Sequence, residues 1–250
     1  MKLSEIIHLV GSGDAGGLSL SHPLDCHVYL LDGGDELALI DAGAGQDIDI
    51  LLTNAMASGC QVDKIRYLLI THAHFDHAGG AAALRQKLNI KVCAAQKTAR
   101  ILESADAEAN GLAPLQRAGL YPPEARFQPC PVDLIVSDGM ELNIGNVSLR
   151  AIASPGHSVD HTAYLVKSEE TALFSGDALL AGGKILIQAL PDVSLADYTN
   201  TIEKFNRLET EIQQLFPAHG IFSLKRAGRH IRLAQESLNQ FRIPPNAILD

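Results

Sequence analysis

Apolar residues along the chain follow two spacings, one typical of strands and one typical of helices. Ile48, Leu51, Leu52 and Ala55 recur at three- and four-residue intervals before Gly59, which predicts a helix that ends at this glycine. Other apolar runs are short and bounded by turn residues, which is typical of buried strands. Strands are predicted at Val28–Asp32, Leu37–Asp41, Tyr67–Thr71, Ile90–Ala94, Leu134–Val136, Val147–Ile152, Thr162–Val166, Thr171–Phe174 and Gln213–Phe216.

Helical segments alternate with these strands in both halves of the chain. Gly33-Gly34 between the first two strands predicts a hairpin. Ser194 is expected to cap a helix that has Asp197 in its first turn. Further helices are predicted over Gly80–Leu88, 96–120 and Ser223–Asn239. This alternation indicates an α/β (α+β) protein with mixed sheets covered by helices, folded as a single domain over residues 1–250.

Composition and charge narrow the class of protein. The 250 residues are 46% hydrophobic and 20% charged, which excludes a disordered chain. A formal net charge of −9 disfavours partners such as nucleic acid or anionic membranes. The four cysteines form no C-x-x-C pair, and the apolar run Ile6–Val10 is too short for a signal peptide or a membrane span. A cytoplasmic protein is therefore expected.

The strongest candidate for chemistry is the segment THAHFDHAGG at residues 71–80, directly after a predicted strand. His72 and His74 are two residues apart, so in an extended segment their side chains leave the same face. Asp76 and His77 follow where the chain turns toward the next helix, and they can point to a second position nearby. Neutral imidazoles and a carboxylate suit zinc, iron or manganese, so a metal site is predicted here.

Three later segments repeat the pattern of a strand followed at once by a candidate metal ligand. His157 ends Ser-Pro-Gly-His, Asp177 ends Ser-Gly-Asp, and His219 ends Pro-Ala-His. Each follows a predicted strand and stands next to a glycine. Because ligand sites in open α/β sheets lie beyond the carboxyl ends of strands, these residues are predicted to join the His72–His77 segment in one site.

These motifs, together with Asp41-Ala-Gly43, resemble those of metallo-β-lactamase-fold hydrolases, in the same order and over residues 26–220. The superfamily includes glyoxalase II and lactonase-like enzymes. The resemblance implies a four-layer αββα sandwich with the site along one edge of the two sheets. It also implies a cofactor of two divalent metal ions, most simply zinc, with iron or manganese as alternatives.

Carried over position by position, the resemblance assigns a role to each motif residue. The first metal would be held by His72, His74 and His157. The second would be held by Asp76, His77 and His219, with Asp177 bridging the two. Asp41 would orient ligand imidazoles from behind, a role that metal sites generally need.

The function implied is a binuclear, metal-dependent hydrolase of a small-molecule ester, thioester or lactone. A hydroxide that bridges the metals would be the nucleophile, and Asp76 would be the catalytic residue that passes the proton on. The alternatives are a mononuclear iron persulfide dioxygenase of the same fold, a β-lactam or phosphotriester hydrolase, and a non-catalytic metal-binding protein. His74 disfavours the flavodiiron members, which have glutamate at that position.

The substrate pocket is less well marked. A helical insert at about 96–131 carries apolar residues suited to an acyl-binding cleft, to packing on the domain or to a homodimer interface. His22, His161 and Lys184 are weaker candidates for contact with substrate, and His161 also for a position behind the ligands. His8 is expected to be incidental to the site.

Overall fold

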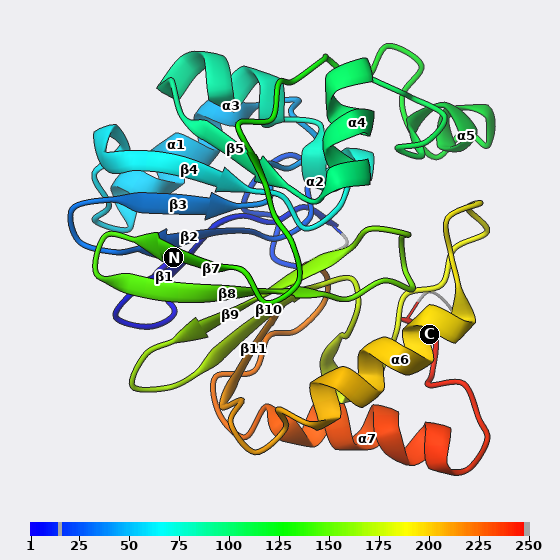
Figure 1. The fold of residues 1–250 in the computed structure, drawn as a ribbon. Coiled ribbons are helices and arrows are strands. Elements are labelled where there is room, and N and C mark those ends of the chain that lie inside the picture. The colour runs from blue at the N-terminus through cyan, green and yellow to red at the C-terminus, as the bar shows by residue number, and fades with distance from the viewer. Residues whose placement is uncertain (15–16, 248–250) are drawn as a thin grey trace. The chain divides into compact units, whose positions relative to one another are not determined.

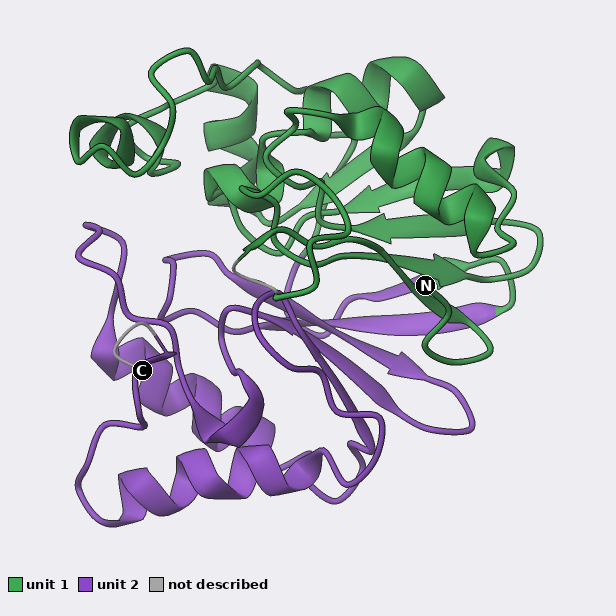
Figure 2. Cartoon of the chain, turned by 180° about the vertical axis from the view of Figure 1, so that it is seen from behind, with its two compact units in different colours: residues 1–136, 143–146 green, residues 137–142, 147–250 purple. Residues whose placement is uncertain are grey.

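A computed structural model describes residues 1–14 and 17–247 of the chain. The chain divides into two compact units (Figure 2). The first, called here the N-terminal unit, comprises residues 1–136 and 143–146. The second, the C-terminal unit, comprises residues 137–142 and 147–250.

The N-terminal unit contains a six-stranded sheet in the order β1-β2-β3-β4-β5-β6. The first three strands are antiparallel neighbours, whereas β3 to β6 are parallel. Its strands are β1 (Ile7–Gly11), β2 (Val28–Asp32), β3 (Leu37–Ile40), β4 (Ile65–Leu69), β5 (Lys91–Ala94) and β6 (Leu134–Ile135). Its helices are α1 (Ile48–Ala57), α2 (Phe75–Ala78), α3 (Ala81–Leu88), α4 (Gln96–Ser104) and α5 (Leu112–Arg117), with a 3-10 turn η2 (Val62–Lys64).

The second sheet has five strands in the order β11-β10-β9-β8-β7, with β10 and β11 parallel and β8, β9 and β10 antiparallel. The strands are β7 (Glu141–Ile144), β8 (Val147–Ala153), β9 (Thr162–Lys167), β10 (Ala172–Gly176) and β11 (Gln214–Pro217). The helices of the C-terminal unit are α6 (Leu195–Asn206), α7 (Gly228–Asn239) and the 3-10 turn η3 (Ala181–Gly183). The two α-helices lie side by side (Figure 1).

Most of the predicted elements are confirmed. The Gly33-Gly34 hairpin joins β2 to β3, and the Ser194 hydroxyl caps α6 by accepting the Asp197 N–H at 3.2 Å. Helices α4 and α5 occupy the predicted 96–131 insert. The chain is mixed α/β with two sheets, as expected.

Strands β1 and β7 were not predicted. The buried β1 contains His8, which interrupts the apolar run, and β7 has exposed or partly exposed residues at its first three positions. Hydrophobic patterning therefore marks neither strand. No helix within the described ranges is long and apolar enough to cross a membrane.

The core of the C-terminal unit forms where α6 and α7 cover one face of its sheet. Phe205 of α6 is fully buried among side chains that include Leu215 of β11 and Ile231 of α7. The apolar spacing of α6 thus places its hydrophobic face on the sheet.

We expect Phe205→Ala to lower the free energy of unfolding by about 3–5 kcal/mol, because it removes a fully buried ring and leaves a cavity. Phe241→Ala is the matched control, since Phe241 is 100% exposed and its ring is not part of the core. Denaturant titration followed by circular dichroism measures both variants. Equal loss of stability in the two variants would contradict this account of the core.

Candidate functional site

In the N-terminal unit, Asp41 holds two residues of the candidate site, Thr71 and His77, by hydrogen bonds. It follows β3 with a positive φ of 62°, a backbone conformation that is uncommon for a residue with a side chain. Its buried carboxylate accepts hydrogen bonds from the Thr71 backbone N–H at 2.8 Å and from the Thr71 hydroxyl at 2.8 Å. It also accepts one from Nδ1 of His77 at 2.9 Å. Three donors thus compensate for burying this charge.

These bonds set the protonation of two imidazoles. An ionised carboxylate only accepts hydrogen bonds, so Nδ1 of His77 carries a proton, and in the neutral ring that binds metals Nε2 presents its lone pair. The Thr71 hydroxyl donates its one proton to Asp41, so its oxygen accepts from Nδ1 of His72 at 3.0 Å. Nε2 of His72 is then also a lone-pair donor. Both imidazoles are buried and present the nitrogen that metal sites use.

The predicted turn after the histidines is the single-turn helix α2. The His77 and Ala78 N–H groups both donate to the His74 carbonyl, at 3.0 and 2.9 Å. Gly79 and Gly80 follow, with φ values of −58° and −82°. Any residue can adopt these values, so the backbone conformation alone does not require glycine at either position. A Cβ at Gly80 would instead lie 2.3 Å from the Ala42 carbonyl oxygen. The glycines are required because the turn packs directly against the backbone after Asp41.

The insert contributes Tyr121 to this cluster. The Tyr121 ring lies 5.4 Å from that of Phe75, centroid to centroid, and its hydroxyl hydrogen-bonds the Asp76 carboxylate. Burial raises the pKa of Tyr121, and the Asp76 charge raises it further. The phenol therefore stays protonated and is the donor of this bond. The insert also holds the turn directly, because the Asn110 carbonyl accepts the Phe75 N–H at 3.1 Å.

In the C-terminal unit, the His157 ring is oriented from α6. Nδ1 of His157 donates to the Leu186 carbonyl at 2.8 Å, so its Nε2 also presents a lone pair. The Tyr198 hydroxyl of α6 donates to the same carbonyl at 2.7 Å. A Cβ on Gly156 would lie 2.6 Å from the Tyr198 ring, so this glycine allows the close approach of the helix.

Asp177 is placed between two imidazoles in the same unit. Its carboxylate oxygens lie 3.3 Å from Nε2 of His157 and 3.5 Å from Nε2 of His219. The Asp177 backbone N–H donates to Nε2 of His161 at 3.1 Å, while Nδ1 of His161 hydrogen-bonds the Ser154 hydroxyl at 2.8 Å. Both nitrogens of the buried His161 ring thus bond to protein. His161 thus holds the backbone of Asp177, and its contact with substrate stays a prediction.

The donor atoms of both units suit a divalent cation. With the His157 ring neutral, its Nε2 and an oxygen of Asp177 are two acceptors that face each other at 3.3 Å, an arrangement that a cation between or beside them stabilises. In the N-terminal unit, Nε2 of His77 faces an oxygen of Asp76 at 3.6 Å in the same way. Buried neutral imidazoles with carboxylates are a donor set for zinc, iron or manganese. The residues present therefore fit the metal that the fold implies.

Two of the weaker sequence candidates have local roles in the structure. Nδ1 of the half-buried His22 accepts the Leu24 N–H at 3.3 Å within its own turn. Lys184 is half-buried, and its carbonyl accepts the Leu180 N–H at 2.8 Å. Their contact with substrate stays a prediction.

Sequence reasoning missed the positioning roles of Thr71, Tyr121 and Tyr198. The two tyrosines stand in apolar patterns that predict packing only, and a hydroxyl adds no signal to such a pattern. Thr71 directly precedes His72, and a hydroxyl between a strand and a ligand segment is the one cue that was available.

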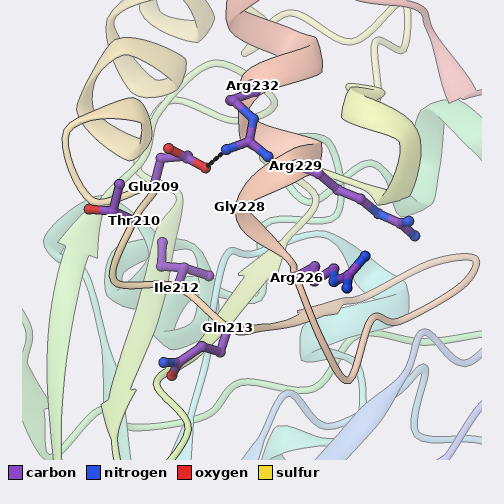
Figure 3. A pocket seen from close by; sticks show the side chains of 8 residues that line it. All are labelled: Glu209, Thr210, Ile212, Gln213, Arg226, Gly228, Arg229 and Arg232. Atoms are coloured by element: carbon purple, nitrogen blue, oxygen red, sulfur yellow. Dashed lines mark hydrogen bonds and ion pairs between the residues drawn. The ribbon is translucent and has the colours of Figure 1, made fainter.

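The open cavity in Figure 3 is not at these imidazoles. It has a volume of about 570 Å³ and is bordered by Arg226, Arg229 and Arg232, the last of which pairs with Glu209. Gln213, which also borders it, immediately precedes β11, whereas His219 follows the other end of that strand. The cavity and the His219 side chain therefore belong to opposite ends of β11.

Known proteins show the same fold and related sequences. The crystal structure of BJP-1, a subclass B3 metallo-beta-lactamase of Bradyrhizobium japonicum, is similar to this chain with a TM-score of 0.73 at 22% identity, over 96% of this chain and 91% of that one. A beta-lactamase-like protein 2 homolog of Caenorhabditis elegans is 26% identical over 219 residues, which are 88% of this chain and 63% of the relative. An atrochrysone carboxyl ACP thioesterase of Aspergillus fumigatus is 27% identical over 86% of this chain and 56% of its own length.

The chain thus spans somewhat more than half the length of these curated relatives. The similarity to BJP-1 confirms the predicted metallo-β-lactamase fold. One of these relatives is named as a thioesterase, which is a hydrolase. The family model of the metallo-beta-lactamase superfamily matches residues 22–219, most of the chain. This chain belongs to the metallo-beta-lactamase superfamily.

Proposed function

We propose that this protein is a binuclear, zinc-dependent hydrolase of a small-molecule thioester, ester or lactone. The observation that carries the proposal is the pair of facing acceptors found in each unit, Nε2 of His77 with Asp76 and Nε2 of His157 with Asp177. In both pairs, a bond at Nδ1 fixes the imidazole so that its lone pair faces the carboxylate.

The proposed ligands are those that the family motifs assign. One metal takes His72, His74 and His157; the other takes Asp76, His77 and His219; Asp177 is shared. Divalent metals bound by such residues polarise a carbonyl and lower the pKa of water toward neutrality.

The chain's own residues then orient these donors and hold a proton. Asp41 and the Leu186 carbonyl keep the protons of His77 and His157 on Nδ1. Asp76 is the carboxylate that accepts the proton released by the attacking water, and the Tyr121 hydroxyl fixes its orientation. The insert at 96–131 brings Tyr121 and Phe75 together, so it forms an apolar wall next to Asp76.

Thioesters are the substrate class to test first. The A. fumigatus relative is named as an ACP thioesterase, and it aligns with 86% of this chain. Apolar rings beside Asp76 suit the acyl part of such a substrate better than a charged group.

The test is metal analysis followed by hydrolysis assays on thioesters, lactones, β-lactams and phosphotriesters. We expect two zinc ions per chain and turnover of a thioester or lactone by the reconstituted protein. Asp76→Asn should lower the turnover about 100-fold, because it removes the proton acceptor. The exposed Asp35→Asn is the matched control. Iron with oxygen uptake would instead show a dioxygenase, and no turnover by fully loaded protein would contradict a hydrolase.

Asp41→Asn is expected to weaken metal binding about 10- to 100-fold, because the amide does not reproduce the charge that orients His77 and holds Thr71. Competition with a chelator of known affinity measures this loss. Asp35→Asn again serves as the control. Unchanged affinity in Asp41→Asn would show that the carboxylate does not position the imidazoles.

Tyr121→Phe should lower kcat about tenfold and leave KM and metal content unchanged, because it removes only the donor to Asp76. Tyr67→Phe is the matched control, since Tyr67 lies half-buried on β4. Steady-state kinetics with metal analysis of both proteins gives the comparison. A loss of metal in Tyr121→Phe, or full activity, would contradict this role.

A further inference from the structure

A second cluster of metal-ligating side chains lies at the other end of the N-terminal sheet. It consists of His8 on β1, Asp32 at the end of β2 and Cys60 after α1, and one ligand atom of each lies within 4.8 Å of the other two. Because β2 and β3 are antiparallel, Asp32 is paired with Leu37 at the start of β3, whereas Asp41 follows the end of β3. The cluster is therefore distinct from the site around Asp41.

Sheet register brings two of these side chains together. His8 is paired with Leu30 across the antiparallel β1–β2 ladder. Asp32 stands two residues beyond Leu30 and so projects from the same face as His8. The two are diagonal neighbours, which is within reach of an imidazole and a carboxylate.

The end of α1 supplies the third side chain. Gly59 has a φ of 93°, and the Cys60 N–H donates back to the Ala55 carbonyl at 3.0 Å. This is the glycine-dependent reversal that commonly ends helices. Asn54 ties α1 to β1 by donating to the Val10 carbonyl at 2.8 Å, so the reversal returns Cys60 toward the β1 face.

The histidine of this cluster is prepared to act as a ligand. His8 is only 3% exposed, and its Nδ1 has no hydrogen-bond partner among the described residues. A buried polar nitrogen without a partner is costly, and a bound cation removes that cost.

We propose that His8, Asp32 and Cys60 form a zinc site that fastens β1 to β2 and to the end of α1. Nitrogen, carboxylate oxygen and thiolate sulfur together are a donor set that zinc accepts in tetrahedral sites, with solvent as the fourth ligand. Asp32 is only partly buried, which leaves a route for the ion. The Cys60 thiol loses its proton when the ion binds.

The ligand atoms of His8, Asp32 and Cys60, which lie within 4.8 Å of one another, must move closer together to bind zinc. Zinc–ligand bonds of about 2.0–2.3 Å set donor atoms roughly 3.5 Å apart, so the atoms must move inward by about 1 Å at most. Two cations oppose the site: Lys2, which pairs with His8 in a β-bridge, and the amino group of Met1. Removing the Lys2 charge should strengthen metal binding without touching a ligand.

Cobalt substitution tests the site through its sulfur ligand. The metal-stripped full chain is titrated with Co²⁺ alone, and the sulfur-to-cobalt charge-transfer band in the near ultraviolet is followed. We expect the band in the wild type, its loss in Cys60→Ser and its displacement by Zn²⁺. Cys93→Ser and Cys130→Ser are matched controls that replace other buried cysteines and should keep the band. No band, or a band that persists in Cys60→Ser, would overturn the proposal.

Two further measurements keep the test decisive if Cys60→Ser folds poorly. Asp32→Asn should weaken the cobalt band titration about tenfold, and Lys2→Gln should strengthen it about threefold. In the wild type, Zn²⁺ should slow alkylation of Cys60 about tenfold, with the labelled residue identified by mass spectrometry. Unchanged titrations in both variants, or alkylation of Cys60 at the same rate with and without zinc, would also overturn it.

Discussion

The proposed chemistry depends on a bond at the rear nitrogen of each anchored imidazole. A histidine can bind a metal through either nitrogen, and only a fixed acceptor at Nδ1 selects Nε2. In the N-terminal unit that acceptor is the Asp41 carboxylate for His77, and in the C-terminal unit it is the Leu186 carbonyl for His157. The imidazole is thus oriented by a charged carboxylate in the N-terminal unit and by a backbone carbonyl in the C-terminal unit.

Each of these two acceptors constrains which residues can surround it. A buried carboxylate is tolerated only when donors surround it, so Asp41 needs both the backbone and the hydroxyl of Thr71. A carbonyl costs less to bury but must itself be held in place, and the Tyr198 hydroxyl holds Leu186 from α6. That bond in turn brings α6 so close that position 156 has no room for a side chain. Leu186 and Tyr198, which are distant from His157 in sequence, are therefore constrained by the orientation of its ring.

The sequence allowed the candidate ligands to be predicted because each follows a strand within a compact motif. His72, Asp177 and His219 are of this kind, and their local context is visible without a structure. Among the supporting residues, Asp41 is predicted by the family motif, but Tyr121 and Tyr198 could not be predicted, because their partners are distant and their side chains fit an apolar pattern. Tyr198 recurs at helical spacing like a core residue, and its hydroxyl bond to Leu186 depends on where the helix packs. His8 is a similar case: it is one polar residue in a short apolar run, and the sequence alone does not show which side chains lie next to it.

The N-terminal sheet thus carries two histidine clusters at opposite ends with donors of different softness. Around His72 and His77 the proposed donors are imidazoles and carboxylates, which iron, manganese and zinc all accept. Around His8 a cysteine replaces one of them, and a thiolate favours zinc over the harder ions. In the second cluster the nitrogen without a partner within the described residues, Nδ1 of His8, is itself the proposed ligand atom, so no hydrogen bond at Nδ1 fixes the ring. A site built in this way suits a structural ion that pins chain segments, whereas oriented imidazoles suit an ion that must hold one geometry through a reaction.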